Sequence, residues 1–302
     1  MFEKFIAVYR ENDYGSLNEN EKLAKHTTLR VGGPARVFVQ PKDKQSFIET
    51  IKLVRSYDLS FKVLGKGSNV LVSDALFEGV IIKSDPGLDY VSINETVVTM
   101  GAGVSDVKVA REMAKAGLSG MEFLSGVPGT IGGAVYMNAG AYLKETKDIL
   151  IKAQILDEFN QLRWLRRDEL EMTYRTSILQ RKPEWVVVEA VFQLEAGNPE
   201  ESLALIRKRK EKRMTAQPLE MPSAGSTFRN PEGHAAWKLV DDANLRGFSV
   251  GGAMVSTKHT NFVVNNNDAT AQNIMDVINH VKSQIWEKFD LEMHQEVEFF
   301  NW

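Results

Sequence analysis

Hydrophobic and polar residues along the first quarter of the chain predict a strand, a helix and a second strand. Residues 37–39 and 61–64 are short apolar runs, as expected of strands. The segment between them has apolar residues at the spacing of one helical face, namely Phe47, Ile48, Ile51 and Val54. This order is βαβ-like. Residues 70–72 predict a further strand after a glycine-containing turn at 65–69.

The middle third consists mainly of short apolar runs. They predict strands at 80–82, 90–93, 97–100, 152–157, 161–166 and 185–194. One helix interrupts them, with Ser105 or Asp106 as a suitable N-cap and Gly117 at its C-terminal end. The predicted inner face of this helix is Val109, Ala110 and Met113. We therefore expect an α+β arrangement around a mostly antiparallel sheet.

The last third alternates helical and strand patterns. It predicts helices at 200–213, 234–243 and 269–289 and strands at 248–255, 262–265 and 295–300. The longest helix carries an apolar stripe that we place in the core, formed by Ile274, Val277, Ile278, Val281 and Ile285. The helix at 200–213 ends in a basic run. This run resembles a phosphate or nucleic-acid patch, but cations near a helix C-terminus usually face solvent, so we interpret most of it as a solvated face.

Composition narrows the classes of function. A chain of 302 residues with a net charge of −3 can form two or three packed units and has no electrostatic signature of nucleic-acid binding. The absence of cysteine excludes disulfides and thiolate catalysis, and the histidines lack the spacing of a metal site. No signal peptide is apparent, and no segment reaches the roughly 18 apolar residues of a membrane span. We expect a cytoplasmic protein without metal, nucleic-acid or membrane partners.

Two glycine-rich segments are candidates for binding a phosphate-bearing ligand. Residues 125–142 contain five glycines and Pro128, which suits a backbone that a large ligand approaches closely. Residues 65–69 can form a nest of backbone N–H groups for a pyrophosphate. They are not a dinucleotide fingerprint, since Val70 stands where the third glycine should be. The alternatives are a plain loop at 125–142 and a tight hairpin turn at 65–69.

Three polar positions are candidates for catalysis. Arg175 follows Tyr174 in a short polar stretch, Ser226 lies in a polar loop bounded by prolines, and Glu296 lies in the last predicted strand. Each has a plainer interpretation, as a surface ion pair, a turn hydroxyl and an exposed strand residue. Ser226 lacks the setting of a nucleophile elbow, so a Ser-His-Asp triad is not predicted.

The ordered motifs resemble one enzyme family. They are Gly65-Lys66-Gly67-Ser68-Asn69-Val70-Leu71, Gly126-Val127-Pro128-Gly129-Thr130-Ile131-Gly132-Gly133-Ala134, Met137-Asn138-Ala139-Gly140-Ala141-Tyr142, Tyr174-Arg175 and Ala224-Gly225-Ser226. This order is similar to that of the UDP-N-acetylenolpyruvoylglucosamine reductases, over about residues 27–300. The stretch from Tyr174 to Arg213 is short and lacks an inserted tyrosine loop, so the chain resembles the compact second type.

The resemblance implies a fold and its division into domains. The expected fold is α+β, with an FAD-binding region of the vanillyl-alcohol-oxidase type (PCMH type, about 28–195) made of two α+β subdomains. A C-terminal α+β domain binds substrate. The implied boundaries are 1–78 plus 291–302 for the first subdomain, 79–213 for the second and 214–290 for the substrate domain. We expect a monomer.

The resemblance also implies a two-stage reaction in peptidoglycan precursor synthesis. NADPH reduces non-covalently bound FAD, and the hydride then passes to the enolpyruvyl ether of UDP-N-acetylglucosamine enolpyruvate, giving UDP-N-acetylmuramate. The planar fork of Arg175 suits the substrate carboxylate and the developing enolate oxygen. Glu296, if protonated, can donate a hydrogen bond to the same intermediate. Ser226 is the implied proton donor to the carbanion.

The remaining implied site residues follow from the same motifs. The expected FAD contacts are Arg30, Gly32, Gly33, Gly65, Gly67, Ser68, Asn69, Gly126, Pro128, Gly129, Thr130, Gly132, Gly133 and Ala134. The expected substrate contacts are Tyr174, Arg213, Gly225 and Asn230. Glu298 stands where the family usually has an arginine, so no cationic contact is implied there. On an extended strand the Glu298 carboxylate lies on the same face as Glu296, and repulsion between the two charges favours the protonated form of Glu296.

Two alternatives remain open. The first is an FAD-dependent sugar or alcohol oxidase of the same flavin fold. Such enzymes often attach flavin covalently through a histidine in a glycine loop, and residues 65–69 and 126–134 contain none. The second is a non-catalytic nucleotide-sugar-binding protein. It predicts loss of the catalytic side chains, yet Arg175, Ser226 and Glu296 are all present.

Overall fold

The computed structural model describes all 302 residues and divides them into two compact units. Unit 1 comprises residues 1–20, 36–65 and 78–210, and unit 2 comprises residues 21–35, 66–77 and 211–302. Each unit has its own cluster of buried apolar side chains. The boundaries expected for three domains stay a prediction.

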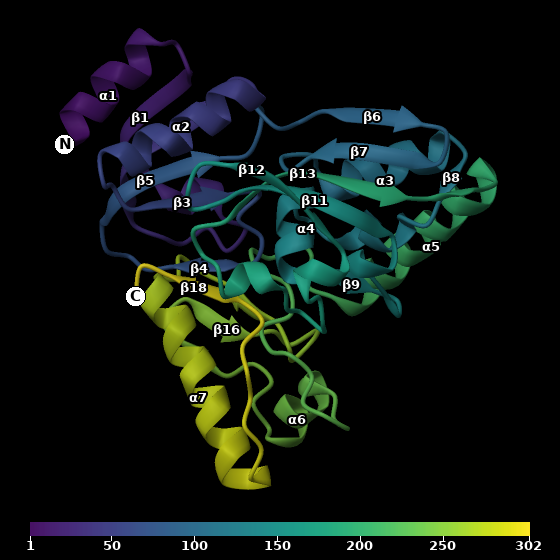
Figure 1. The fold of residues 1–302 in the computed structure, drawn as a ribbon. Helices are drawn as coiled ribbons and strands as arrows, with labels where there is room; N and C mark the ends of the chain where they lie inside the picture. Colours follow the sequence, from purple (N-terminus) through teal and green to yellow (C-terminus); the bar gives the residue numbers. More distant parts are fainter. The chain divides into compact units, whose positions relative to one another are not determined.

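The first sheet of unit 1 has the strand order β1-β2-β5-β3. Its strands are β1 (Gly15–Lys22), β2 (Pro34–Pro41), β5 (Phe77–Lys83) and β3 (Phe61–Leu64), and β3 runs parallel to β5. Two helices, α1 (Phe2–Glu11) and α2 (Lys44–Ser56), lie beside this sheet (Figure 1). Asp43 caps α2 by accepting a hydrogen bond of 2.7 Å from the Ser46 N–H. The predicted apolar face of α2 is buried, as the helical spacing indicated.

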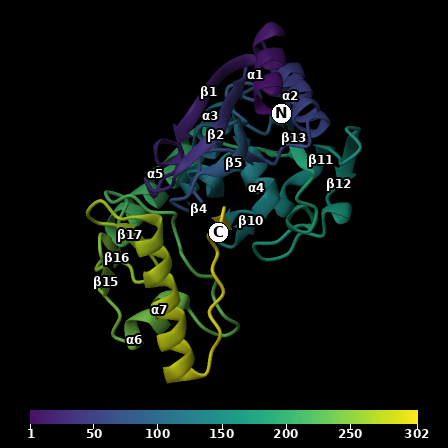
Figure 2. The same ribbon diagram turned by 90° about the vertical axis from the view of Figure 1, so that its left-hand side faces the viewer.

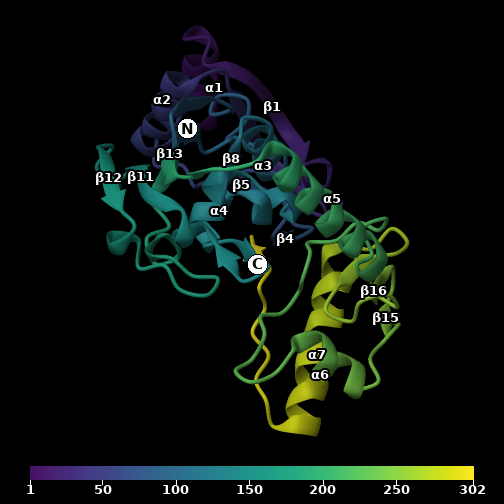
Figure 3. The same cartoon turned by 90° about the vertical axis from the view of Figure 1, so that its right-hand side faces the viewer.

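The second sheet of unit 1 is antiparallel throughout, as predicted for the middle third. Its order is β12-β11-β13-β7-β6, and the strands are β12 (Leu162–Arg166), β11 (Leu150–Leu156), β13 (Val186–Gln193), β7 (Val97–Gly101) and β6 (Val91–Asn94). Helices α3 (Asp106–Lys115) and α4 (Ile131–Met137) lie beside this sheet (Figures 1 and 3). Both sheets contribute to one core, because their buried side chains belong to one cluster.

Unit 2 is built around one long helix. This helix, α7 (Ala271–Phe289), lies along a small antiparallel sheet (Figure 2). The sheet consists of β15 (Ser249–Val250), β16 (Ala253–Val255) and β17 (Val263–Asn265). The five residues of the predicted stripe on α7 are all at most 1% exposed, which confirms that this face is core. A shorter helix, α6 (Ala236–Asp242), adds to the same cluster.

A parallel strand pair joins distant parts of the sequence within unit 2. β4 (Val70–Val72) pairs with β18 (Glu298–Phe300), with Val70 opposite Glu298. Since β3 and β4 belong to different sheets, the hairpin alternative for residues 65–69 is wrong. The last strand begins later than predicted. Gln295 instead forms an isolated bridge with Phe228.

The glycine-rich segment is only partly a loop. Ile131–Met137 form α4, which includes Gly132 and Gly133, so the glycine loop expected at 126–134 is in part a helix. Glycine is needed at 132 because an added Cβ would lie 2.9 Å from the Ala102 Cβ. The helix thus sits directly against the β7–α3 connection, and the glycines permit helix packing as well as ligand approach.

The other elements are short, apart from α5 (Pro199–Ala216), which extends three residues past the predicted end. Two-residue strands form the pairs β8 (Leu118–Ser119) with β14 (Glu195–Ala196) and β9 (Gly140–Ala141) with β10 (Lys144–Glu145). Single 3₁₀ turns occupy Leu23–His26, Glu122–Gly126, Thr146–Asp148, Asp168–Leu170 and Ile178–Gln180. None of the helices is long and apolar enough to cross a membrane.

Candidate functional site

The end of β3, the end of β5 and the start of α4 lie together in unit 1, at Gly65, Lys83 and Thr130. An added Cβ on Gly65 would lie 2.5 Å from the Thr130 Oγ1, so the Gly65 backbone packs directly against the Thr130 side chain. The Lys83 ammonium donates a hydrogen bond to the Gly65 carbonyl and lies 3.2 Å from the Asp85 carboxylate. The Lys83 side chain is only 8% exposed. A buried cation, which no sequence motif indicated, therefore lies beside the predicted pyrophosphate turn.

A buried carboxyl lies behind the second glycine segment. Asp106 is the first residue of α3 and is fully buried. Its backbone N–H donates to the Gly129 carbonyl at 3.2 Å, and a Cβ on Gly129 would lie 2.7 Å from the Asp106 Oδ2. Neither carboxyl oxygen has a hydrogen-bond partner. Burial raises the pKa of Asp106 well above its ordinary value, because desolvation disfavours the charged carboxylate.

Six other predicted FAD contacts lie in unit 2, namely Arg30, Gly32, Gly33, Gly67, Ser68 and Asn69. The Thr28 N–H donates to the Gly67 carbonyl at 3.0 Å, and the Gly33 N–H donates to the Ser73 carbonyl at 2.7 Å. Gly67 has a φ of +63°, and an added Cβ would lie 2.1 Å from the His26 carbonyl oxygen. The structure therefore brings the segment containing Arg30, Gly32 and Gly33 against the turn at 66–69.

Ser226 and Glu296 lie on segments that are hydrogen-bonded to each other. The Glu296 N–H donates to the Thr227 carbonyl at 2.8 Å, and the Arg229 N–H donates to the His294 carbonyl at 2.9 Å. Asn69 joins this pair, because its side-chain amide donates to the Glu296 carbonyl at 3.1 Å. Hydrogen bonds in unit 2 thus connect one predicted FAD contact, Asn69, to Glu296, and Glu296 to the residue that follows Ser226.

Arg175 lies in unit 1, on a tight turn. Thr173 and Thr176 exchange backbone hydrogen bonds of 3.0 and 3.1 Å, so Tyr174 and Arg175 form the tip. Arg175 has a φ of +55°, a left-handed conformation that is uncommon for a residue with a side chain. Its guanidinium carbon lies 4.9 Å from the centre of the Tyr174 ring. The predicted catalytic set is therefore drawn from both units.

Two predicted substrate contacts make hydrogen bonds that also serve the fold. The Arg213 Nε donates to the Gln217 Oε1 at 2.8 Å, just past the C-terminal end of α5. The Asn230 Oδ1 accepts from the Ala236 N–H at 2.9 Å, at the start of α6. Gly225, by contrast, has a φ of +77° and nothing within 4 Å of an added Cβ, so its surroundings are open.

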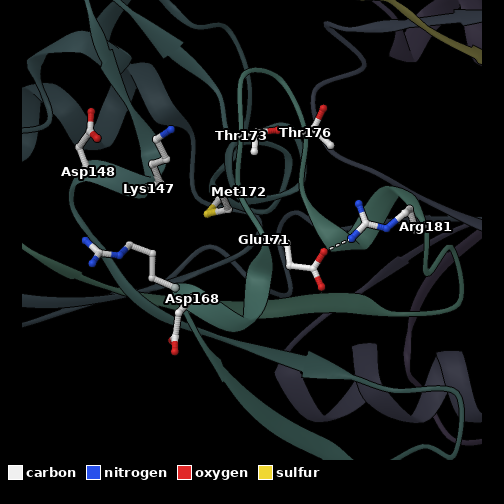
Figure 4. A pocket seen from close by; sticks show the side chains of 9 residues that line it. Lys147, Asp148, Asp168, Glu171, Met172, Thr173, Thr176 and Arg181 are labelled. Atoms are coloured by element: carbon white, nitrogen blue, oxygen red, sulfur yellow. Dashed lines mark hydrogen bonds and ion pairs between the residues drawn. The ribbon is translucent and has the colours of Figure 1, made fainter.

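A cavity of about 570 Å³ flanks the Arg175 turn (Figure 4). It is lined by Lys147, Asp148, Arg167, Asp168, Glu171, Met172, Thr173, Thr176 and Arg181. The three basic and three acidic side chains balance in charge, and Glu171 forms an ion pair with Arg181. Because this lining contains none of the predicted catalytic or FAD-binding residues, we do not assign the cavity to the reaction. No cluster of side chains suits a metal ion.

Comparisons with known proteins agree in both halves of the chain. A family model described as FAD binding domain matches residues 35–165, and one described as UDP-N-acetylenolpyruvoylglucosamine reductase, C-terminal domain, matches residues 217–300. UDP-N-acetylenolpyruvoylglucosamine reductases from Anoxybacillus flavithermus and Bacillus subtilis are 43% and 44% identical to this chain, over 98% of each chain. The chain belongs to the UDP-N-acetylenolpyruvoylglucosamine reductase family.

A solved structure supports the same assignment. The crystal structure of UDP-N-acetylenolpyruvylglucosamine reductase from Thermus caldophilus superposes with a TM-score of 0.79 at 30% identity, covering 95% of this chain and all of that one. The predicted α+β fold with an FAD-binding domain is confirmed, and so is the prediction of an FAD-dependent oxidoreductase. The family acts on a UDP-sugar in peptidoglycan precursor synthesis, as expected.

The residues present fit the cofactor. Gly133 is exposed, and an added Cβ there would meet only the Thr130 Oγ1, at 3.8 Å, whereas Gly65 and Gly132 pack against Thr130 and Ala102. The backbone there is accessible to a flat ring or a phosphate. The Lys83 ammonium beside Gly65 suits a neighbouring pyrophosphate. FAD is therefore compatible with this part of unit 1.

Proposed function

We propose that this chain catalyses the NADPH-dependent, FAD-mediated reduction of UDP-N-acetylglucosamine enolpyruvate to UDP-N-acetylmuramate. The observation that carries the proposal is the network that ties Asn69 of the cofactor turn to Glu296, and Glu296 to the residue after Ser226. It joins three motifs that are far apart in sequence and that the family resemblance assigns to one reaction.

FAD would be held mainly by backbone. The residues that we assign to it are Arg30, Gly32, Gly33, Gly65, Gly67, Ser68, Asn69, Gly126, Pro128, Gly129, Thr130, Gly132, Gly133 and Ala134. When bound, FAD takes up a hydride from NADPH and supplies it to the enolpyruvyl double bond. The glycines allow the isoalloxazine ring and the pyrophosphate to approach the main chain without a steric clash.

The protein's own part in the second stage is to stabilise charge and move one proton. Hydride addition at the terminal enolpyruvyl carbon places negative charge on the carbon that bears the carboxylate. Arg175 binds this carboxylate and the developing enolate oxygen through its N–H donors. Ser226 donates the proton to the carbanion, and Glu296 in its protonated form donates a hydrogen bond to the same intermediate.

We assign Tyr174, Arg213, Gly225 and Asn230 to the nucleotide-sugar. Tyr174 is 45% exposed at the tip of its turn, so its ring can contact substrate. We further propose a monomer in the bacterial cytoplasm, where both NADPH and UDP-sugars occur, with no nucleic-acid or membrane partner. The proposed division is 1–78 plus 291–302, 79–213 and 214–290.

The test is an anaerobic stopped-flow experiment on the purified flavoprotein. NADPH should bleach the flavin absorbance, and the UDP-enolpyruvyl sugar should then restore it. Bleaching without return, but with fast reoxidation by oxygen, would instead indicate the oxidase. A colourless protein that cannot be reconstituted with FAD would exclude both enzymes.

A further inference from the structure

Asn138 joins the Arg175 turn to the β9–β10 hairpin in unit 1. It is fully buried and has a φ of +43°. Its amide nitrogen donates to the Thr173 carbonyl at 2.8 Å and to the Glu145 Oε2 at 3.0 Å, while its Oδ1 accepts from the Lys147 N–H at 3.0 Å. All the polar atoms of this side chain are therefore used to hold neighbouring segments together.

Glu145 lies between Asn138 and Arg175. Its Oε1 is 3.8 Å from the Arg175 Nη1, and its Oε2 pairs with the Lys147 Nζ at 2.9 Å. The side chains of Glu145 and Arg175 are only 19% and 16% exposed, so solvent screens their attraction less than at an open surface. Glu145 thus places a negative charge beside the Arg175 guanidinium.

The base of the hairpin contacts the same guanidinium. The Arg175 Nη2 donates to the Gly140 carbonyl at 2.8 Å. An added Cβ on Gly140 would lie 2.9 Å from the Glu145 Cγ, so the two residues are closely packed. Gly140 and Glu145 therefore hold two nitrogens of one planar group. A guanidinium has five N–H donors and can make both contacts while binding a carboxylate through others.

We propose that Glu145, held by Asn138, is a positioning residue that fixes the orientation of the Arg175 guanidinium for the substrate carboxylate. This inference rests on the proposed function, in which Arg175 binds that carboxylate. A misoriented fork loses its bidentate geometry, which matters most when charge develops in the transition state. Glu145 itself touches neither substrate nor cofactor in this role.

The test separates the two half-reactions. Glu145→Gln keeps the size of the side chain and an oxygen for Asn138, but removes the charge. We expect Glu145→Gln to slow substrate-dependent flavin reoxidation by about tenfold, equivalent to about 1.4 kcal/mol. Flavin reduction by NADPH and the FAD content should stay within twofold of the parent. Glu171→Gln is the matched control, since Glu171 pairs with Arg181 in the same unit but does not contact Arg175.

A double-mutant cycle decides whether Glu145 acts through Arg175. In the Arg175→Ala background, Glu145→Gln should change reoxidation by less than twofold, because the group that it positions is gone. A loss that persists in that background, or an equal loss in both half-reactions, would overturn the positioning role. A parent-like rate for Glu145→Gln alone would also overturn it. If Arg175→Ala itself leaves reoxidation unchanged, the proposed function of Arg175 fails instead.

Discussion

Asn69 contacts the Glu296 segment through both its side chain and its backbone. Its side-chain amide donates to the Glu296 carbonyl at 3.1 Å, and its own carbonyl accepts from the Glu298 N–H at 2.9 Å. The last residue of the cofactor turn is therefore fixed to the segment that carries the predicted acid. A displacement of either segment would move the other.

Replacing Asn69 with alanine should weaken FAD binding and substrate-dependent reoxidation together. The lost hydrogen bond costs about 1 kcal/mol, or roughly fivefold in an equilibrium constant. FAD affinity is measured by flavin fluorescence on titration of the apoprotein. Asn301→Ala is the control, because Asn301 makes similar bonds to Ser73 and Ala75 in the same unit. If both variants lose FAD affinity equally, Asn69 has no specific role.

Ser226→Ala should leave flavin reduction by NADPH nearly intact and slow reoxidation by the enolpyruvyl substrate. A proton transfer of this kind contributes roughly 10²- to 10⁴-fold to the rate. Ser226→Cys should retain part of the activity, since a thiol can also donate a proton. Ser283→Ala on the exposed face of α7 is the control. Equal loss in both half-reactions would rule out proton donation by Ser226.

Asp106 should make the protein less stable as the pH rises. The folded state keeps the proton on this carboxyl, whereas the unfolded chain releases it near pH 3.9, the approximate pKa of a free aspartate. Stability from this group is therefore full below about pH 4 and declines by up to about 1.4 kcal/mol per pH unit until the folded-state pKa is reached.

Asp106→Asn removes this titration. Thermal unfolding between pH 5 and 9 should show a smaller decline in Tm for the variant, and a higher Tm than the parent at the alkaline end. Asp276→Asn is the control, because Asp276 accepts a hydrogen bond at the exposed surface of α7. Parallel Tm profiles for the parent and Asp106→Asn would show that the buried carboxyl is ionised or solvated.

Ile278→Ala should destabilise unit 2. Ile278 is 1% exposed on the core face of α7, and such truncations cost about 2 to 5 kcal/mol. Leu205→Ala is the control, since Leu205 is 39% exposed on α5 and should cost little. Thermal unfolding gives the comparison. Similar Tm values for Ile278→Ala and the parent would mean that the helix is not packed as described.

The spacing of apolar residues predicted correctly which faces of α7 and α3 are buried. The helical stripe on α7 and the inner face of α3 are buried because apolar spacing alone determines the face that a helix presents to a core. The start of α4 was missed. Its glycines at 132 and 133 disfavour a helix intrinsically, and packing against Ala102 outweighs that preference.

The site depends on contacts between residues distant in sequence, which spacing cannot give. Family resemblance supplied Arg175, Ser226 and Glu296, but nothing in the sequence pairs β4 with β18 or joins Asn69 to Glu296. The sequence indicates Asp106 only as a possible helix N-cap, because its burial beside Gly129 results from the tertiary fold. Lys83 and Glu145 carry no sequence signal, because a charged residue in a strand or turn is ordinarily exposed.

The parallel pairing of β4 with β18 also determines how late in synthesis the turn at 65–69 can be completed. Val70 emerges from the ribosome 228 residues before its partner Glu298. At about 5 to 20 residues per second, this gap lasts roughly 10 to 45 s. During that time the turn at 65–69 lacks the strand that fixes Asn69. The nascent chain can therefore complete its cofactor turn only after residues 298–300 are made, even if unit 1 has already folded.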